Sequence, residues 1–303
     1  MTTHWGEEAR RRLLSLRRGA GVWSYGPSTA PATEPTALAG LALRETDPEA
    51  ARAAASWLAA AQSRDGSVGV SQDLAEMGWP TPYACLLWAA VARHRSEREA
   101  AVVWLLGTKG RGEPRVKHNP IGHDTTLIGW PWISGTHSWV EPTAMALLAL
   151  GREGRRDHPR AQEGLAVIRD RSIPTGGWNM GNPVVLGATL RPQPAPTALA
   201  LLAMSGSKLD ATPAVQRAIR YLRSVLSETR APASLSWGVL GLRAWGAAPA
   251  SAEAWLRLAF HHAVRRGGSA MDMALLLLAA DCGSLDVLGA SPREGSVHDD
   301  DAN

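Results

Sequence analysis

The chain has 303 residues, of which 45% are hydrophobic and 20% charged, a balance that is typical of globular proteins and excludes disordered and fibrous classes. The net charge of +4 is small for this length, and no DNA- or RNA-binding motif is present, so nucleic acid is not an expected partner. Two cysteines are too few for a disulfide framework. The N-terminus lacks the apolar core of a secretory signal, and no apolar run reaches the length of a membrane span. We therefore expect a cytoplasmic protein, and peripheral contact with a membrane stays open.

Two kinds of helical segment alternate along the chain. Six amphipathic segments carry arginine and glutamate on one face; they span residues 6–18, 48–62, 96–106, 159–171, 213–227 and 252–266. Each is followed by a segment that is apolar on nearly every side, at 34–43, 81–90, 141–150, 195–204, 234–245 and 269–280. Helices that are apolar all round are buried, and amphipathic helices cover them. No stretch has the period of two that a half-buried strand requires, so strands are not expected.

The apolar segments are copies of one phrase. Pro-Thr-Ala occupies the second to fourth positions of 34–43, 141–150 and 195–204, and 81–90 is a looser copy. Proline suits the first turn of a helix. An open solenoid would need polar capping repeats, but the first and last apolar segments are no more polar than the others. We predict an all-α (α/α)6 toroid, a barrel of six helical hairpins, as a single domain over 1–290, with an acidic, disordered tail at 291–303.

Turns that contain glycine, most of them with tryptophan, follow three of the amphipathic segments, at 21–26, 62–69 and 176–181. Together with the Pro-Thr-Ala phrase, these turns resemble the repeats of the squalene–hopene cyclase and protein prenyltransferase β-subunit superfamily, over residues 6–283. The resemblance implies a terpenoid cyclase-like toroid with a central apolar cavity that binds an isoprenoid. It also implies a second helical domain or subunit as a partner that completes the site.

The resemblance includes a partial match to a catalytic sequence motif. Class II terpene cyclases have an Asp-x-Asp-Asp-Thr-Ala pattern whose middle aspartate is the general acid. Residues 139–144 are the best match here: Glu141 takes the place of the acid, and tryptophan and proline stand where the flanking aspartates would be. The prenyltransferase zinc pattern, an Asp-x-Cys pair, is absent at both Cys85 and Cys282. The resemblance therefore implies acid-initiated carbocation chemistry without a metal.

The connection from 107 to 141 is the longest in the chain and contains three histidines, one aspartate and three tryptophans. Long connections in a compact domain are often functional, and we expect this one to fold over the mouth of the toroid. Asp124 is then a second candidate acid, and His137 is a candidate partner that tunes Glu141. The three tryptophans are Trp130, Trp132 and Trp139. They would either present their ring faces to a carbocation or an isoprenoid, or fill the centre of the toroid as packing residues.

Further candidates lie elsewhere. Asp272, near the start of the last apolar segment, is a candidate catalytic carboxylate or only a complement to that helix N-terminus, whereas Glu34 is expected to cap its helix. The remaining candidate substrate-binding residues are Tyr83, His123, Trp178 and Arg191. His118, His123, Asp124 and His137 match no standard metal-ligand spacing, so we predict no metal and no other cofactor.

Three functions remain open. The first is an isoprenoid-processing enzyme, a divergent terpene cyclase or prenyltransferase. The second is a non-catalytic toroid that binds a lipid or a partner protein, which the missing flanking aspartates favour. The third is a glycan-active (α/α)6 barrel, whose carboxylate pair would come from Asp124, Glu141 and Asp272. The sequence favours isoprenoid binding and leaves catalysis open.

Overall fold

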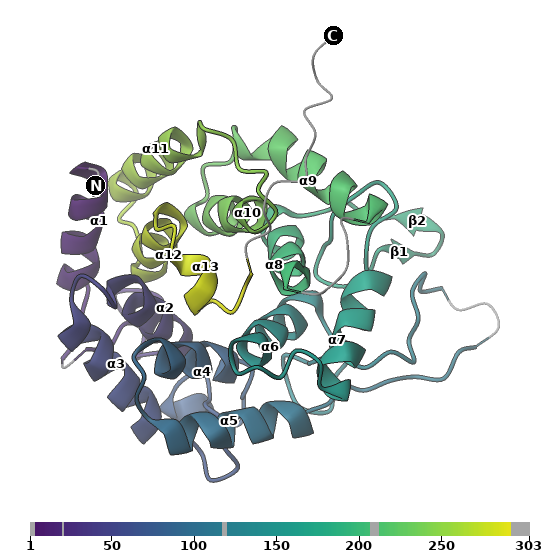
Figure 1. Ribbon diagram of the computed structural model, residues 1–303, viewed down its shortest axis with the longest axis horizontal. Coiled ribbons are helices and arrows are strands. Elements are labelled where there is room, and N and C mark those ends of the chain that lie inside the picture. The colour runs from purple at the N-terminus through teal and green to yellow at the C-terminus, as the bar shows by residue number, and fades with distance from the viewer. Residues whose placement is uncertain (1–3, 20, 117–119, 207–211, 292–303) are drawn as a thin grey trace.

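The computed structural model describes residues 4–19, 21–116, 120–206 and 212–291. Within these residues, twelve helices form two concentric rings (Figure 1). The outer ring consists of α1 (His4–Ser15), α3 (Pro48–Ala60), α5 (Arg95–Gly107), α7 (Pro159–Asp170), α9 (Pro213–Leu226) and α11 (Ala252–Arg265). The inner ring consists of α2 (Thr33–Leu43), α4 (Thr81–Ala90), α6 (Val140–Arg152), α8 (Pro194–Ser205), α10 (Pro232–Ala244) and α12 (Ala270–Ala280). The alternation predicted from the sequence is confirmed to within a few residues. The predicted tail, apart from Ser291, lies outside the described residues.

Burial follows the sequence pattern. Every residue of α8 from Pro196 to Ser205 is buried, as expected of a helix enclosed on all sides. The outer helix α9 buries one stripe, Val215, Ala218, Ile219, Leu222 and Leu226, and leaves Arg220 and Arg223 exposed. Proline is the first residue of several helices, among them α3, α7 and α9, where its missing N–H costs nothing.

The ring is closed. Helix α12 packs against both α1 and α2, so the last hairpin meets the first (Figure 1). Two polar contacts join the ends of the chain across this seam. The indole N–H of Trp5 donates to Glu253, with 2.7 Å between the nitrogen and Oε1, and Arg44 forms an ion pair with Asp281.

A repeated hydrogen-bond pattern explains why the phrase contains threonine. In three hairpins, the backbone N–H of a tryptophan in the preceding turn donates to the threonine Oγ1 over 2.9–3.0 Å. The indole N–H of the same tryptophan donates to a carbonyl of the outer helix before it, over 2.6–2.9 Å. The three pairs are Trp23 with Thr36, Trp130 with Thr143, and Trp178 with Thr197. These contacts fasten each inner helix to the outer ring.

The two ends of the inner ring differ. Each inner helix follows, in the chain, an outer helix that runs in the opposite direction. The six inner helices therefore all run in one direction. At the end where they finish, the short helix α13 (Ser284–Val287) lies inside the ring (Figure 1). It is held there by the ion pair of Arg152 with Asp286 and by a hydrogen bond from Arg156 to the carbonyl of Gly289. The opposite end, where the inner helices begin, carries the long connections and is called here the N-terminal end of the inner ring.

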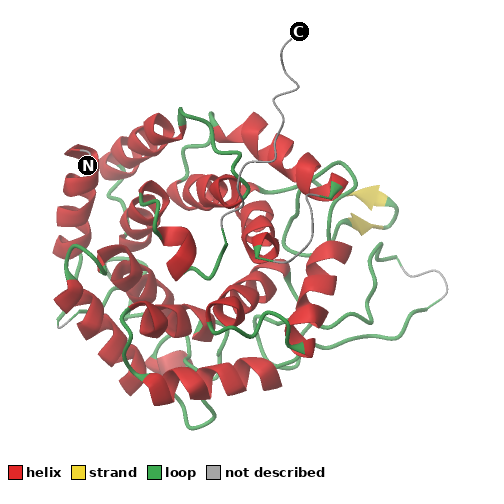
Figure 2. Ribbon diagram, in the orientation of Figure 1, coloured by secondary structure: helices red, strands yellow, loops and turns green. Residues whose placement is uncertain are grey.

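One expectation about secondary structure is wrong. A small antiparallel hairpin of β1 (Val184–Val185) and β2 (Ala188–Thr189) lies in the connection from α7 to α8, at the outer edge of the ring (Figure 2). Its two-residue turn places Leu186 at φ 50° and Gly187 at φ 78°, the left-handed geometry that tight hairpins favour. Strands this short leave no detectable alternation in the sequence. A 3-10 turn at Gln72–Leu74 was likewise not predicted.

Candidate functional site

Two glutamates of the repeated phrase meet at the N-terminal end of the inner ring. Glu34 and Glu141 are each the second residue of their helices, α2 and α6. Glu34 is only 8% exposed, and burial raises its pKa above the ordinary value. The pKa of Glu141 is raised to about 7, first by burial and then by the negative charge of Glu34. Two neighbouring carboxylates cannot both ionise easily away from water, so the pair retains a proton near neutral pH.

A tyrosine on each of two elements surrounds Glu34. The hydroxyl of Tyr25, in the turn after α1, donates a hydrogen bond to Glu34 Oε2 over 2.7 Å. Tyr83, on α4, is fully buried; its pKa is raised by burial and by the charges of Glu34 and Glu141. The Tyr83 hydroxyl lies beside Glu34, but it has no hydrogen-bond partner of normal geometry among the described residues. Tyr25 therefore stabilises the anion on Glu34.

The position of the shared proton follows from these contacts. A hydrogen bond to a carboxylate favours its charged form. Glu34 accepts such a bond, whereas the pKa of Glu141 is raised without any opposing donor. The hydrogen bond from Tyr25 therefore favours the ionised form of Glu34 against the effect of burial, and the raised pKa of Glu141 favours its protonated form. A neutral carboxylic acid beside an ionised one is an arrangement that suits general acid catalysis.

Aromatic rings extend from this pair toward the surface. Tyr83 and Trp79 meet edge to face with 6.2 Å between ring centroids, and Trp79 and Trp132 do so at 4.8 Å. Trp132, predicted as a substrate-binding residue, thus lies two rings away from the carboxyl pair. It also lines a cleft of about 970 Å³ together with Trp79 and Trp104.

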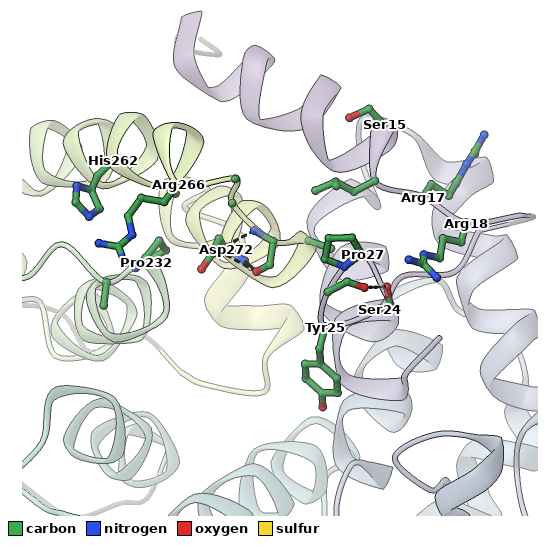
Figure 3. Close-up of a pocket in the computed structure, with 18 of the residues that line it drawn as sticks. Ser15, Arg17, Arg18, Ser24, Tyr25, Pro27, Pro232, His262, Arg266 and Asp272 are labelled. Atoms are coloured by element: carbon green, nitrogen blue, oxygen red, sulfur yellow. Dashed lines mark hydrogen bonds between the residues drawn. The ribbon is translucent and has the colours of Figure 1, made fainter. Parts of the chain in front are cut away.

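A second cleft, of about 730 Å³, lies on the Tyr25 side (Figure 3). The segment after α1, the start of α10 and the connection from α11 to α12 line it. Tyr25 is 36% exposed and lines this cleft with one edge, while its hydroxyl bonds to Glu34. It is the residue that joins the cleft to the carboxyl pair.

The long connection does not fold over the mouth along its whole length as expected. Its first part runs outside the outer ring beside α7 (Figure 1), where Ile121 pairs with Val185 and the backbone N–H of Asp124 donates to Asp170. Asp124 is paired with Arg115 and accepts bonds from the N–H and hydroxyl of Thr126. These contacts hold the pKa of Asp124 well below its usual range, which favours its ionised form and argues against the predicted role as an acid.

Three further assignments fail for structural reasons. His137 is exposed, and its Nε2 lies 3.3 Å from a nitrogen of Arg111; it makes no ion pair with Glu141. Asp272 is held in a capping box, in which its carboxylate accepts from the backbone N–H and hydroxyl of Ser269. Glu34, expected to cap α2, makes no capping bond.

Two predicted substrate-binding tryptophans are packing residues. Trp130 is 2% exposed and Trp178 is 1% exposed. Both indoles point outward to the outer ring, where Trp130 bonds to the carbonyl of Leu105 and lies 3.7 Å from the guanidinium of Arg160. Trp178 bonds to the carbonyl of Ile168 on α7. Neither indole is placed to meet a ligand inside the ring.

The other candidates lie at the periphery. Trp139 and Arg191 line one shallow groove with residues 179–182. His123 is half-buried, and burial together with the charge of Arg171 lowers its pKa to about 4. His118 lies outside the described residues. Of the predicted set, the structure brings together Glu141, Tyr83 and, through Trp79, Trp132. No group of three or more His, Cys, Asp or Glu among the described residues is arranged to hold a metal.

The comparisons with known proteins agree on the fold. No family model matches the chain, and no curated protein matches it. Among solved structures, a protein from Actinoplanes shares 19% identity over 86% of this chain and 80% of that chain, with a TM-score of 0.57. Type II terpene cyclase MstE from Scytonema, in complex with its substrate geranylgeranyl dihydroxybenzoate, shares 17% identity over 86% of this chain and 77% of that chain, with a TM-score of 0.59.

A second structure of MstE, in complex with the product merosterolic acid A, gives a TM-score of 0.57 and the same 17% identity. At these identities the likeness shows the fold, which is that of the terpenoid cyclase α/α toroid. Most of both chains is matched, so MstE is a chain of similar length. No described helix is long and apolar enough to cross a membrane.

Proposed function

We propose that this protein binds an isoprenoid at the N-terminal end of the inner ring and that Glu141 starts its cyclisation by donating a proton. The observation that carries the proposal is a half-buried carboxyl, Glu141, whose pKa is about 7, beside a second carboxyl, Glu34, whose charge is stabilised by Tyr25. An acid works best when it still holds its proton at the working pH.

The chemistry divides between the two glutamates. Glu141 transfers its proton either to one carbon of a terminal double bond, whose electron pair forms the new C–H bond, or to the oxygen of a terminal epoxide, whose C–O bond then breaks and leaves a hydroxyl group. In both cases a carbocation is left on the neighbouring carbon. Ring closures consume further double bonds, and a carboxylate of the pair accepts the proton that the last carbocation loses. The product is therefore an isomer of the substrate. The charge of Glu34 and the ring faces of Tyr83 and Trp79 stabilise the positive charge.

The raised pKa also bears on the substrate. It keeps the proton on Glu141, but it makes that proton harder to give away than the proton of an ordinary carboxylic acid. A terminal epoxide accepts a proton more readily than a plain alkene, so an epoxidised polyene fits this acid best. The absence of the flanking aspartates of class II cyclases agrees with this preference.

Two findings from the comparisons support the proposal. MstE, a type II terpene cyclase, is a chain of similar length with the same fold. Its crystallised substrate carries a geranylgeranyl chain, which is the type of tail that we propose for the ligand here.

The experiment is an incubation of the purified protein with squalene, a geranylgeranyl compound and their terminal epoxides, followed by mass-spectrometric analysis of the products. We expect cyclic isomers from the wild type and a loss of at least about 100-fold in rate for Glu141→Gln, which keeps the shape but has no proton to give. Glu228→Gln, at an exposed position, is the matched control. Equal product from wild type and Glu141→Gln refutes the proposal, and bound isoprenoid without turnover favours a non-catalytic binding protein.

A further inference from the structure

Three tryptophans meet around the cleft that Trp132 lines. Trp79 lies just before α4, Trp104 lies on α5, and Trp132 belongs to the long connection before α6. All three side chains are half-buried, so each leaves part of its indole on the wall of this cleft of about 970 Å³. Segments that are distant in the sequence supply the walls, so the cleft is a product of the tertiary fold.

The indoles form a corner and not a flat platform. The rings of Trp79 and Trp132 stand 76° apart, with 4.8 Å between their centroids. Trp104 packs against Gly78, where an added Cβ atom would come within 2.6 Å of the indole Cζ2, so the third ring is seated by the absence of a side chain at 78. A sugar stacks on a flat ring face, whereas a rounded, methylated cation fits between ring faces that meet at an angle.

The rim of the cleft carries two carboxylates and two cations. Asp65 and Glu76 supply the carboxylates, and Arg64 and Lys109 supply the cations. All four side chains are exposed, and within the described residues none of them takes part in an ion pair. Although burial opposes it, hydrogen bonds from the backbone N–H and hydroxyl of Ser67 hold the pKa of Asp65 below its ordinary value. The rim therefore offers both signs of charge to a ligand.

We propose that this cleft binds a small zwitterion in which a quaternary ammonium group is joined to an anionic group, as in phosphocholine. The methylated ammonium group lies in the corner of Trp79 and Trp132, where the ring faces attract it and the rim carboxylates supply the opposite charge. Arg64 and Lys109 bind the anionic group through charge-assisted hydrogen bonds. The ligand is bound without chemical change, so this site does not depend on the proposed cyclisation.

The test compares three soluble probes by isothermal titration calorimetry at one fixed salt concentration, because exposed charges are screened. Phosphocholine carries both groups, choline lacks the phosphate, and phosphoethanolamine lacks the methyl groups. We expect phosphocholine to bind about tenfold tighter than either of the other two. Equal affinities for phosphocholine and phosphoethanolamine overturn the proposal, as does the absence of phosphocholine binding at millimolar concentrations.

A second measurement distinguishes a free ligand from a lipid head group. The protein is sedimented with phosphatidylcholine vesicles, with and without free phosphocholine. Sedimentation that free phosphocholine abolishes supports the site and assigns it to the lipid head group. Binding of free phosphocholine without sedimentation supports the site and assigns it to a soluble zwitterion.

Variants locate the ligand. Trp132→Leu should weaken binding of phosphocholine and of choline by about tenfold, whereas Lys109→Gln, at an exposed position, should weaken binding of phosphocholine alone. Trp255→Leu removes a half-buried indole of α11, and Arg52→Gln removes an exposed cation of α3; both lie outside the cleft and should change neither affinity. Unchanged phosphocholine binding in both Trp132→Leu and Lys109→Gln overturns the proposal. Binding of maltose in place of phosphocholine also overturns it, because the cleft would then be a sugar site.

Discussion

The buried acid Glu141 should make the stability of the fold depend on pH. In the folded protein its pKa is about 7, against an ordinary value of 4.5 that applies once the chain unfolds. Between these two values the folded state keeps a proton that the unfolded state has lost. Stability is therefore lost as the pH rises through this window, and the loss is complete above the folded-state pKa.

The size of the effect follows from the two pKa values. Each pKa unit corresponds to about 1.4 kcal/mol, so the difference between 4.5 and about 7 amounts to about 3 kcal/mol of unfolding free energy. This is a large fraction of the total stability of a typical protein. The side chain of Glu141 is largely buried, so solvent screening does not reduce this contribution to the unfolding free energy to that of a surface charge.

The measurement is urea unfolding at a series of pH values from 4 to 8, for wild type and Glu141→Gln. Because other groups also titrate, the informative quantity is the difference between the two proteins at each pH. We expect Glu141→Gln to gain about 3 kcal/mol relative to wild type between the ends of the series. The unfolding free energy of Glu228→Gln, a change at an exposed position, should depend on pH in the same way as that of wild type.

Glu34→Gln provides a second check on the cause. It removes the charge that contributes to the raised pKa of Glu141 but leaves the larger contribution, burial. The pH-dependent loss should therefore become smaller without disappearing. Parallel curves for wild type and Glu141→Gln across the whole series would show that Glu141 is not a buried acid, and the reasoning above would fail.

Two other predictions concern the hydrogen bonds of the ring. Thr143→Val leaves the buried N–H of Trp130 without its acceptor and should lower the free energy of unfolding in urea by about 1–3 kcal/mol; Thr143→Ser keeps the hydroxyl and should recover most of it, and equal losses would contradict the assigned role. Tyr25→Phe removes the donor that stabilises the Glu34 anion, so the acidic limb of the pH–rate profile should move to higher pH. An unchanged acidic limb would show that the bond between Tyr25 and Glu34 has no part in the reaction.

Much of the fold could be predicted from the chain alone. The alternation of amphipathic and uniformly apolar segments predicted twelve helices and their order, because burial of a helix depends on which of its faces are apolar. A closed ring was predicted because the first and last apolar segments are no more polar than the others. What the repeats did not reveal was the reason for threonine at the third position, since its bond to the turn backbone joins residues 13 or 19 apart in the chain.

The candidate site was predicted only in part. Glu141 and Tyr83 were proposed from the resemblance and the phrase, but Glu34 was interpreted as a cap, although it holds the same position in its copy of the phrase as Glu141. That shared position was the available signal. The sequence left two roles open for the tryptophans, because an indole that packs between helices and an indole that faces a ligand look the same in a sequence; Trp130 and Trp178 pack against the outer ring.

The sequence by itself therefore determined the two rings, because helix periodicity and apolar faces are local properties of the chain. Only the tertiary structure decided which acid keeps its proton. A raised pKa requires burial and a neighbouring charge, and Glu34 and Glu141 become neighbours only when α2, α4 and α6 pack side by side around the ring. The same packing placed Asp124 outside the ring and left the cleft beside Tyr25.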